Sequence, residues 1–460
     1  MTGDIALLER LSGKHASKSR ERHEAWSYYD AEYRVKALGV NIPPEMRDLL
    51  GQVGWPRLLV DALEHRLDHE GFRLGGQASA DEELQNWWEV NNLDVESSLV
   101  HLGSLIYGDS YVTISRPDPN DPDHEPGVPV IRGESPESFY AEEDPRTRQI
   151  KWAVRLYESE DIAGIYDGAT LFVPGRTINL RRADPQGRWK VVDEVNTGLK
   201  FVPVVRFPNR PTLDNRRGQS EITPELRSIT DAASRLMMNL HATAELMAIP
   251  QRVLFGVARD ALGDPDNPNA TMDLYTARIL TFEDQGQATQ FSAAELMNFV
   301  NGLQELAKHA ASYTGLPPQY LSFSSENPAS ADAIRASESR LVKTSERKQK
   351  VFGDGWERVM RTAYLVMGRE LPEGSRRMES IWRNAATPTY AAKADAVSKL
   401  VATPTPTGEP LIPIEQARID LGYSPETRRQ MREWSEGDPI HRISRLYADE
   451  APTQNGDDDE

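Results

Sequence analysis

The sequence predicts a helix-rich α+β protein, and three observations lead to this class. Several long segments repeat apolar residues at the three- and four-residue spacing of an amphipathic helix. Between residues 111 and 207, short apolar runs are separated by Gly and Asp turns, as strands are. Because helical segments come first and strand-like runs then follow one another, we expect helices beside an antiparallel sheet.

Composition limits the class of protein further. The chain has 460 residues, of which 38% are hydrophobic, so it is long enough for two or three domains with much polar surface. No stretch approaches the ~18 apolar residues of a membrane span, and residues 1–30 lack a signal-peptide core. The absence of cysteine excludes disulfides and thiol catalysis and fits synthesis in a reducing cytoplasm. A net charge of −18 argues against a protein that coats DNA, although it allows a basic groove or a channel.

The N-terminal part of the chain is predicted to be helical. The helices expected there cover 17–38, 55–67 and two parts of 81–107. Gly71 is the expected stop after the second of them, and Asn91 and Asn92 divide the last region. Leu99 and Ile106 are expected on the core face of the final helix.

A change of periodicity at Ser110 marks the beginning of the sheet. The strand-like runs are 111–114, 128–132, 150–157, 170–173, 188–192 and 201–207. Together they predict one antiparallel sheet after the helices.

Two long amphipathic helices follow, with a small α/β insert between them. Thr223 and Pro224 are suited to the N-cap and first turn of a helix, and the apolar seam after them continues for about six turns. The stretch 292–295 is a capping box that begins the second helix, which has a matching seam. Strand-like runs at 252–257 and 278–282 lie in the insert.

A short exposed loop and a basic helix come next. Pro317 and Pro318 break the second long helix, and Asn327 or Ser330 can cap a new one. The new helix carries four cations at a spacing that places them on one face: Arg340, Lys343, Arg347 and Lys350. We call these four residues the basic stripe. It is either a solvated face paired with neighbouring acids, which we favour, or a surface that contacts a ligand.

The C-terminal part is predicted to hold shorter helices and a disordered end. Helices are expected over 390–401 and 414–420. The last twelve residues carry six acids and no base, so they repel one another and offer no apolar surface to bury.

No motif in the chain indicates an enzyme, a cofactor or a metal site. Ser12-Gly13-Lys14 lacks the residues of a phosphate-binding P-loop. His65 and His69 have the spacing of two metal ligands on a helix, but no third ligand is evident, and an exposed helix face explains them better. Ser345 and Lys348 match the Ser-x-x-Lys of penicillin-reactive hydrolases without the partner motifs, so chance is the better explanation.

An ordered series of short motifs then resembles a known family over nearly the whole length. The motifs are Tyr28-Tyr29-Asp30, Ile42-Pro-Pro-Glu-Met-Arg47, Gly54-Trp-Pro-Arg57, Leu105-Ile-Tyr-Gly108, Leu226-Arg-Ser-Ile-Thr-Asp231, Pro250-Gln-Arg252, Gly315-Leu-Pro-Pro318 and Ala333-Ile334-Arg335. In this order they resemble the portal proteins of tailed double-stranded-DNA bacteriophages, in the version carried by phages of actinobacteria.

The resemblance implies a portal fold that assembles as a ring. Its expected parts are a wing (1–222 and 328–378), two stem helices (223–247 and 292–313), a small α/β clip (248–291), a tunnel loop (314–327), a helical crown (379–448) and a disordered acidic tail (449–460).

The resemblance also implies the function and the partners. The family forms a ring, in virions a dodecamer, at one vertex of the capsid, and genomic DNA passes through its channel during packaging and ejection. The expected partners are double-stranded DNA without sequence preference, the large terminase subunit, the major capsid protein with its scaffold, and the head–tail connector. The protein would be made in the bacterial cytoplasm and reside in the virion, with no membrane contact.

Site residues follow from the same resemblance. The tunnel loop offers neutral groups that DNA can slide past: Gln319, Tyr320, Ser322, Ser324 and Ser325. The clip would dock partners through an acidic turn containing Asp260, Asp264 and Asp266. The basic stripe would face the channel or a neighbouring subunit, and pairing with a neighbour's acids is the interpretation we favour. Two competing hypotheses remain, namely a hydrolase using Ser345 and Lys348 and a DNA-binding assembly scaffold without a channel.

Overall fold

The structure is a computed structural model of the chain, and its compact parts form two units, Met1–Ala385 and Ala386–Glu460. It describes residues 2–32, 52–77, 80–119, 121, 124–159, 165–182, 187–247, 252–255, 279–282, 289–290, 296–321, 331–386, 390–405, 410–423 and 425–437. Each unit is described by itself.

The first unit begins with helices, of which the first lies before the expected ranges and was not predicted. They are α1 (Thr2–Ala16), α2 (Ser19–Tyr29), α3 (Trp55–Glu64), α4 (Glu82–Val90) and α5 (Leu93–Tyr107). The expected break at Asn91 and Asn92 is confirmed, and Asn92 adopts a left-handed backbone with φ 52°. Asp81 caps α4, because its side chain accepts hydrogen bonds from the backbone N–H groups of Glu83 and Leu84.

Three details of this region differ from the sequence prediction. The helix expected over 17–38 ends at Tyr29, where Ala31 turns into the left-handed region at φ 58°, and residues from 33 onward lie outside the described ranges. The helix expected over 55–67 ends at Glu64, and Gly71 lies within a strand instead of stopping a helix. Leu99 is 55% exposed, since the inward face of α5 includes polar residues that the apolar pattern misses: Ser97, His101 and Ser104.

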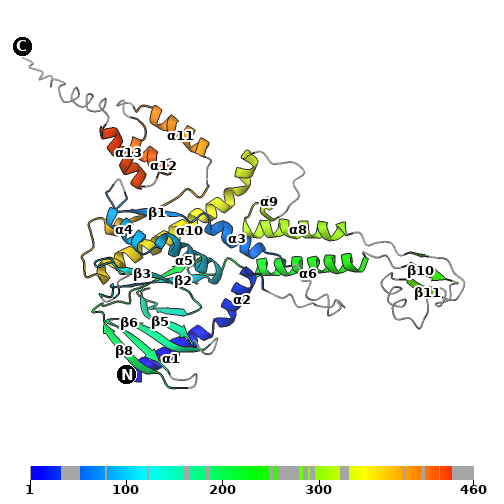
Figure 1. Ribbon diagram of the computed structural model, residues 1–460, viewed down its shortest axis with the longest axis horizontal. Coiled ribbons are helices and arrows are strands. Elements are labelled where there is room, and N and C mark those ends of the chain that lie inside the picture. The colour runs from blue at the N-terminus through cyan, green and yellow to red at the C-terminus, as the bar shows by residue number, and fades with distance from the viewer. Residues whose placement is uncertain are drawn as a thin grey trace, which may run out of the picture. The chain divides into compact units, whose positions relative to one another are not determined.

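The strands β2 to β9 form two antiparallel sheets rather than the single sheet expected (Figure 1). The three-stranded sheet has the order β3-β2-β9, and the five-stranded sheet has the order β4-β5-β6-β7-β8. Their bounds are β2 (Asp109–Ser115), β3 (Val130–Glu134), β4 (Phe139–Glu143), β5 (Ile150–Glu158), β6 (Tyr166–Val173), β7 (Arg176–Arg181), β8 (Lys190–Asn196) and β9 (Val204–Pro208). The six predicted strands are present, whereas β4 and β7 were not expected.

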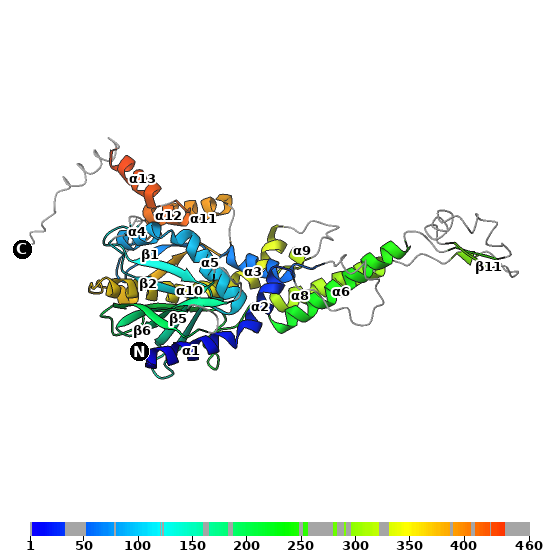
Figure 2. The same cartoon turned by 60° about the horizontal axis from the view of Figure 1, so that its bottom comes forward.

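Helices pack on both sheets, and two of the three described core clusters include residues of these helices. Helix α1 packs on β4 and β5, where Leu8 and Leu11 are fully buried against the five-stranded sheet (Figure 2). Helix α5 and the long helix α10 (Ala331–Val366) both contact strand β2 of the three-stranded sheet. Phe352 and Trp356 of α10 are fully buried in the larger core. Gly355 makes this close packing possible, because a Cβ there would lie 2.7 Å from the Phe207 ring.

A small third sheet and a short 3-10 helix complete the first unit near its end. Strand β1 (His69–Arg73) pairs antiparallel with β13 (Glu379–Trp382), and a bulge lies between His69 and Gly71. The 3-10 helix η3 covers Ser375–Arg377. These two strands are more than 300 residues apart in sequence, so neither has a local signal that would predict it.

The two long helices and their insert agree with the prediction. Helix α6 (Pro224–Met247) packs against α8 (Met297–Thr314), and a Cβ on Gly302 would come within 2.8 Å of Leu236. In the insert, β10 (Arg252–Phe255) pairs parallel with β11 (Ile279–Phe282) and antiparallel with β12 (Thr289–Gln290). The expected capping box at 292–295 and the stop at Pro250 lie outside the described residues.

The second unit is helical. It contains α11 (Tyr390–Ala402), α12 (Ile414–Asp420) and α13 (Pro425–Gly437), of which the first two match the predicted ranges. The acidic tail lies outside the described residues. Among the described helices, none combines the length and the apolar character of a membrane span.

Candidate functional site

The segment after α8 is packed where an exposed loop was expected. Gly315 ends α8 with a left-handed backbone at φ 77°, and Leu316 is buried. Pro318 then begins a short helix, α9 (Pro318–Leu321), which buries Leu321. A proline is tolerated in a first helical turn because its missing N–H would have no helical partner there. The expectation of an exposed loop is therefore wrong for 315–317 and for Leu321, whereas Pro318 and Gln319 are exposed as expected. Residues 322–330 lie outside the described residues.

Gln319 and Tyr320 are held against α10 by their side chains. The Gln319 amide donates a hydrogen bond to Ser337 Oγ at 2.9 Å, and the Tyr320 hydroxyl donates to Glu338 Oε1 at 2.7 Å. Arg66 of the α3 end donates to the Tyr320 hydroxyl at 3.3 Å. Burial and the neighbouring Glu338 carboxylate raise the pKa of Tyr320, so this hydroxyl keeps its proton at neutral pH. Ser322, Ser324 and Ser325 lie outside the described residues.

All four residues of the basic stripe are exposed on α10, as the spacing predicts. Arg340 donates a hydrogen bond to the Ser312 carbonyl at 2.7 Å, and Lys343 pairs with Glu346 at 2.9 Å. Neither Arg347 nor Lys350 makes a hydrogen bond or an ion pair within the described part of the chain. Among the described residues, pairing with acids of the same chain therefore accounts for Lys343 alone of these four.

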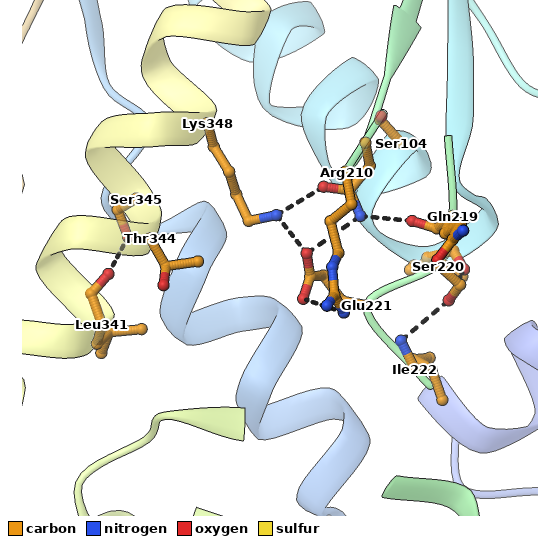
Figure 3. A network of polar contacts seen from close by, with 12 residues as sticks. Ser104, Arg210, Gln219, Ser220, Glu221, Ile222, Leu341, Thr344, Ser345 and Lys348 are labelled. Atoms are coloured by element: carbon orange, nitrogen blue, oxygen red, sulfur yellow. Dashed lines mark hydrogen bonds and ion pairs between the residues drawn. The ribbon is translucent and has the colours of Figure 1, made fainter. Parts of the chain in front are cut away.

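Ser345 and Lys348 do not form a hydrolytic pair (Figure 3). The Ser345 hydroxyl is fully buried and donates to the Leu341 carbonyl at 3.1 Å within its own helix. The Lys348 ammonium points elsewhere: it donates to Asn209 Oδ1 at 2.6 Å and forms an ion pair with Glu221. Because a general base must reach the hydroxyl it activates, this geometry argues against the hydrolase hypothesis.

Lys348 and Glu221 are the centre of a buried polar network. Their side chains are 6% and 7% exposed, respectively. Asn209 donates to Glu221 Oε1 at 3.2 Å and to the Gln219 carbonyl at 2.7 Å, while Arg210 lies 3.8 Å from the second Glu221 oxygen. Burial lowers the pKa of Lys348, and the adjacent Glu221 carboxylate opposes that shift. The network thus attaches α10 to the segment that leads into α6.

A cavity of about 500 Å³ opens beside this network. Five cations are among its lining residues: Arg210, Arg340, Lys343, Arg347 and Lys348. Glu221 is the single carboxylate among the described residues that line it. Sequence reasoning found the basic stripe but missed Arg210, Glu221 and the cavity, because Glu221 and Lys348 are 127 positions apart and no local pattern connects them.

The remaining candidate residues fall in different places. Asp260, Asp264 and Asp266 lie outside the described residues. His65 follows the last turn of α3 and His69 lies in β1, so they do not share a helix as the sequence prediction assumed. Within the described residues there is no group of three or more His, Cys, Asp or Glu side chains that would hold a metal ion.

Comparison with known proteins decides the family. A family model described as phage portal protein, SPP1 Gp6-like, matches residues 9–406. The chain belongs to this family. Two portal proteins of mycobacteriophages are similar to it: that of phage L5 is 48% identical over 457 residues, covering 98% of this chain and 92% of the relative. The portal protein of phage D29 is 49% identical over 437 residues, covering 94% of this chain and 88% of the relative.

A solved structure is also similar to this portal protein, at low identity. It is a chain from the virion of a native gene transfer agent particle, with 12% identity and a TM-score of 0.40, covering 87% of this chain and 98% of that one. The resemblance inferred from the ordered motifs is confirmed by the family match and by the two mycobacteriophage relatives.

Proposed function

We propose that this portal protein forms a dodecameric ring at one capsid vertex, through which genomic DNA enters during packaging and leaves during ejection. The observation that carries the proposal is the family match over residues 9–406. The paired helices α6 and α8 support it, because Leu236 and Phe299 of their seam are only partly buried in a single copy. A ring would cover this remaining apolar surface with neighbouring subunits.

The parts of the chain receive the following proposed roles. The wing is 1–222 with 328–378, the stem 223–247 with 292–313, the clip 248–291, the tunnel loop 314–327, the crown 379–448 and the tail 449–460. Pairing of β13 with β1 and the unit boundary at Ala385 favour moving the beginning of the crown to about residue 386. The clip, with Asp260, Asp264 and Asp266, would dock the terminase and then the head–tail connector.

The channel surface is proposed to let DNA slide without holding it. Because the chain has a net charge of −18, we propose that no register of the duplex is bound strongly. Because α9 anchors Gln319 and Tyr320 to α10, the tunnel-loop contacts with DNA are proposed to involve Ser322, Ser324 and Ser325.

The proposed location is the portal vertex of the virion, after synthesis in the host bacterial cytoplasm. Contacts with the major capsid protein and its scaffold would place the ring during head assembly. These roles require shape and docking surfaces rather than catalysis, and we propose no enzymatic activity and no cofactor for this protein.

Negative-stain images and native mass spectrometry of the purified protein would test the proposal. We expect rings with a central hole and a mass that is a multiple of a single 51.6 kDa chain. A protein that stays monomeric at the concentrations of phage assembly would contradict it.

The alternative is a DNA-binding assembly scaffold without a channel, and the unpaired state of Arg347 and Lys350 within the described residues favours it. A scaffold that grips duplex through these cations would bind DNA with an affinity that falls steeply with salt. We expect little binding of this kind, and a filter-binding titration between 50 and 200 mM salt, roughly the range over which phosphate contacts weaken, would distinguish the two.

A further inference from the structure

The cavity beside α10 has more positive charge than the described acids around it balance, even though Glu346 pairs with Lys343 on its rim. Five cations line it, and Glu221, the carboxylate among its described lining residues, already pairs with Lys348 and accepts a hydrogen bond from Asn209. Arg340 is bound to a carbonyl, and Arg347 has no partner within the described residues. Cations that line one cavity repel one another because they lie close together, although water screens the exposed side chains of Arg340, Lys343 and Arg347. An anion that entered the recess would relieve this repulsion.

The walls of the cavity are suited to hydrogen bonding with an oxyanion. Hydroxyl and amide side chains are also among its lining residues: Thr212, Gln219, Thr223, Thr314 and Thr344. Of these, Thr314 and Thr344 donate their hydroxyl hydrogens to carbonyls of their own helices, which leaves the other three to bind an oxyanion. The floor is rigid, since Lys348 and Glu221 are more than nine-tenths buried and bonded to Asn209. Guanidinium groups such as those of Arg340 and Arg347 bind carboxylates and phosphates with two parallel hydrogen bonds.

The size of the cavity and the net charge of the chain favour a protein carboxylate over a DNA phosphate as the ligand of this cavity. A recess of about 500 Å³ has room for a few side chains of a projecting segment, whereas a duplex presents its phosphates on a broad convex surface. Each copy carries a net charge of −18, so two copies repel each other unless a positive site on one faces acids of the other. The recess is a local excess of positive charge on such a chain.

We propose that this cavity, which we call the basic pocket, binds a carboxylate-bearing segment of a second copy of this chain. The proposal rests on the ring assembly proposed above and identifies one contact within it. Arg340, Lys343 and Arg347 at the exposed side would hold the carboxylates, and the Lys348–Glu221 pair would keep the floor in place. Lys350 belongs to the basic stripe but is not among the residues lining the pocket, so it provides an internal control.

A zero-length cross-linking experiment tests the contact directly. Rings would be assembled from equal amounts of unlabelled and ¹⁵N-labelled chain and treated with a carbodiimide, which activates a carboxylate so that a lysine amine displaces the leaving urea and forms an amide. We expect mixed-isotope cross-linked peptides that join Lys343 to an Asp or Glu of another copy. Cross-links of Lys343 to Glu346 that contain a single isotope, with no mixed species, would overturn the proposal.

A matched pair of variants tests the energetic role. In R340Q/R347Q the pocket loses two exposed cations, and in K350Q/R358Q the same helix loses two exposed cations outside it. We expect the concentration at which rings dissociate to rise about tenfold or more in the pocket variant and to stay within about twofold in the control. The reason is that losing one partner of a charge pair buried in an interface weakens binding more than losing a surface charge.

Three results separate failure of this inference from failure of the proposed function. Unchanged ring stability in R340Q/R347Q would overturn the pocket contact and leave the ring intact. Absence of rings from the unmutated protein would contradict the proposed function itself. Steeply salt-dependent duplex binding that the pocket variant loses and the control keeps would show that the pocket takes DNA phosphates, and would also overturn the inference.

Discussion

At the scale of single residues, the buried ion pair of Lys348 and Glu221 links α10 to the segment that leads into α6. Its two ends come from segments with no common local pattern, and both are enclosed by the fold. A buried ion pair adds little stability compared with apolar packing, but removal of one partner leaves an uncompensated charge in the interior.

We therefore predict that Lys348→Met lowers the free energy of unfolding by about 3–5 kcal/mol, because it strands the Glu221 carboxylate. The double variant E221Q/K348M should recover part of this loss. Denaturant unfolding at fixed protein concentration measures both, and Lys350→Met on the exposed side of the helix serves as the control, with a change within about 0.5 kcal/mol. Equal effects of Lys348→Met and Lys350→Met would contradict the role assigned to the pair.

A second residue-scale prediction concerns two buried histidines. Both ring nitrogens of His69 are shielded from solvent, although part of the residue is exposed, and the ring stacks on Trp88 at 4.3 Å. His101 is fully buried and accepts a hydrogen bond from the Trp356 indole. Burial lowers the pKa of each from 6.5 to about 3, so between these values the unfolded chain binds protons that the folded chain excludes.

Because the folded chain excludes these protons, its free energy of unfolding is highest above about pH 6.5 and falls as the pH drops toward 3. Each histidine contributes a slope of about 1.4 kcal/mol per pH unit in that window. We expect His69→Phe to reduce the slope of the unfolding free energy against pH, between pH 6.5 and 4.5, by about 1.4 kcal/mol per pH unit. The exposed control His23→Gln should leave the contribution of His69 to this slope unchanged. Parallel pH profiles for His69→Phe and the unmutated protein would be inconsistent with a neutral buried His69.

At the scale of elements, the hairpin of α6 and α8 carries the proposed subunit contacts. Leu236 lies against Gly302 and is only partly buried in one copy. We predict that Leu236→Glu lowers the yield of rings, since the new charge would be buried when neighbours pack. Native mass spectrometry would show a shift toward monomer, while the exposed control Asn298→Glu should assemble normally.

The tunnel loop gives a second prediction at this scale. Deletion of 322–325 removes the serines and leaves the anchors of Gln319 and Tyr320 on α10 intact. We expect rings and terminase docking to persist while the length of DNA that is packaged or retained decreases, because neutral groups that exchange with water at ~1 kcal/mol each would be lost from the channel. Packaging of full-length genomes at the normal rate would remove the loop from the mechanism. Tyr320→Phe, which breaks the bond to Glu338, tests the anchor separately.

At the scale of the whole molecule, charge separates into a largely acidic chain and a local basic pocket. The acidic tail is one extreme of this distribution, with six acids in its twelve residues. We predict that truncation after Ala448 leaves ring formation unchanged, since the tail has no apolar surface to contribute. Electron microscopy of the truncated protein checks this, and a loss of rings would show that the tail contacts a structured surface.

The sequence by itself determined the family, the long helices and most of the strands. The seams of α6 and α8 and the break at Asn91–Asn92 are local patterns, because helix periodicity and caps depend on residues within a few positions of one another. The ordered motifs were sufficient for the portal resemblance that the family match confirms.

Only the tertiary structure decided which residues meet. The pairing of β1 with β13, the division into two sheets and the anchoring of Tyr320 on Glu338 join segments without a shared local pattern. The same holds for the basic pocket, where cations from α10 converge with Arg210 and the buried Glu221 around one cavity. Contacts of this kind depend on long-range packing and desolvation, which determine which exposed cations form a site. A local sequence pattern contains no information about either, so these contacts could not be predicted from it.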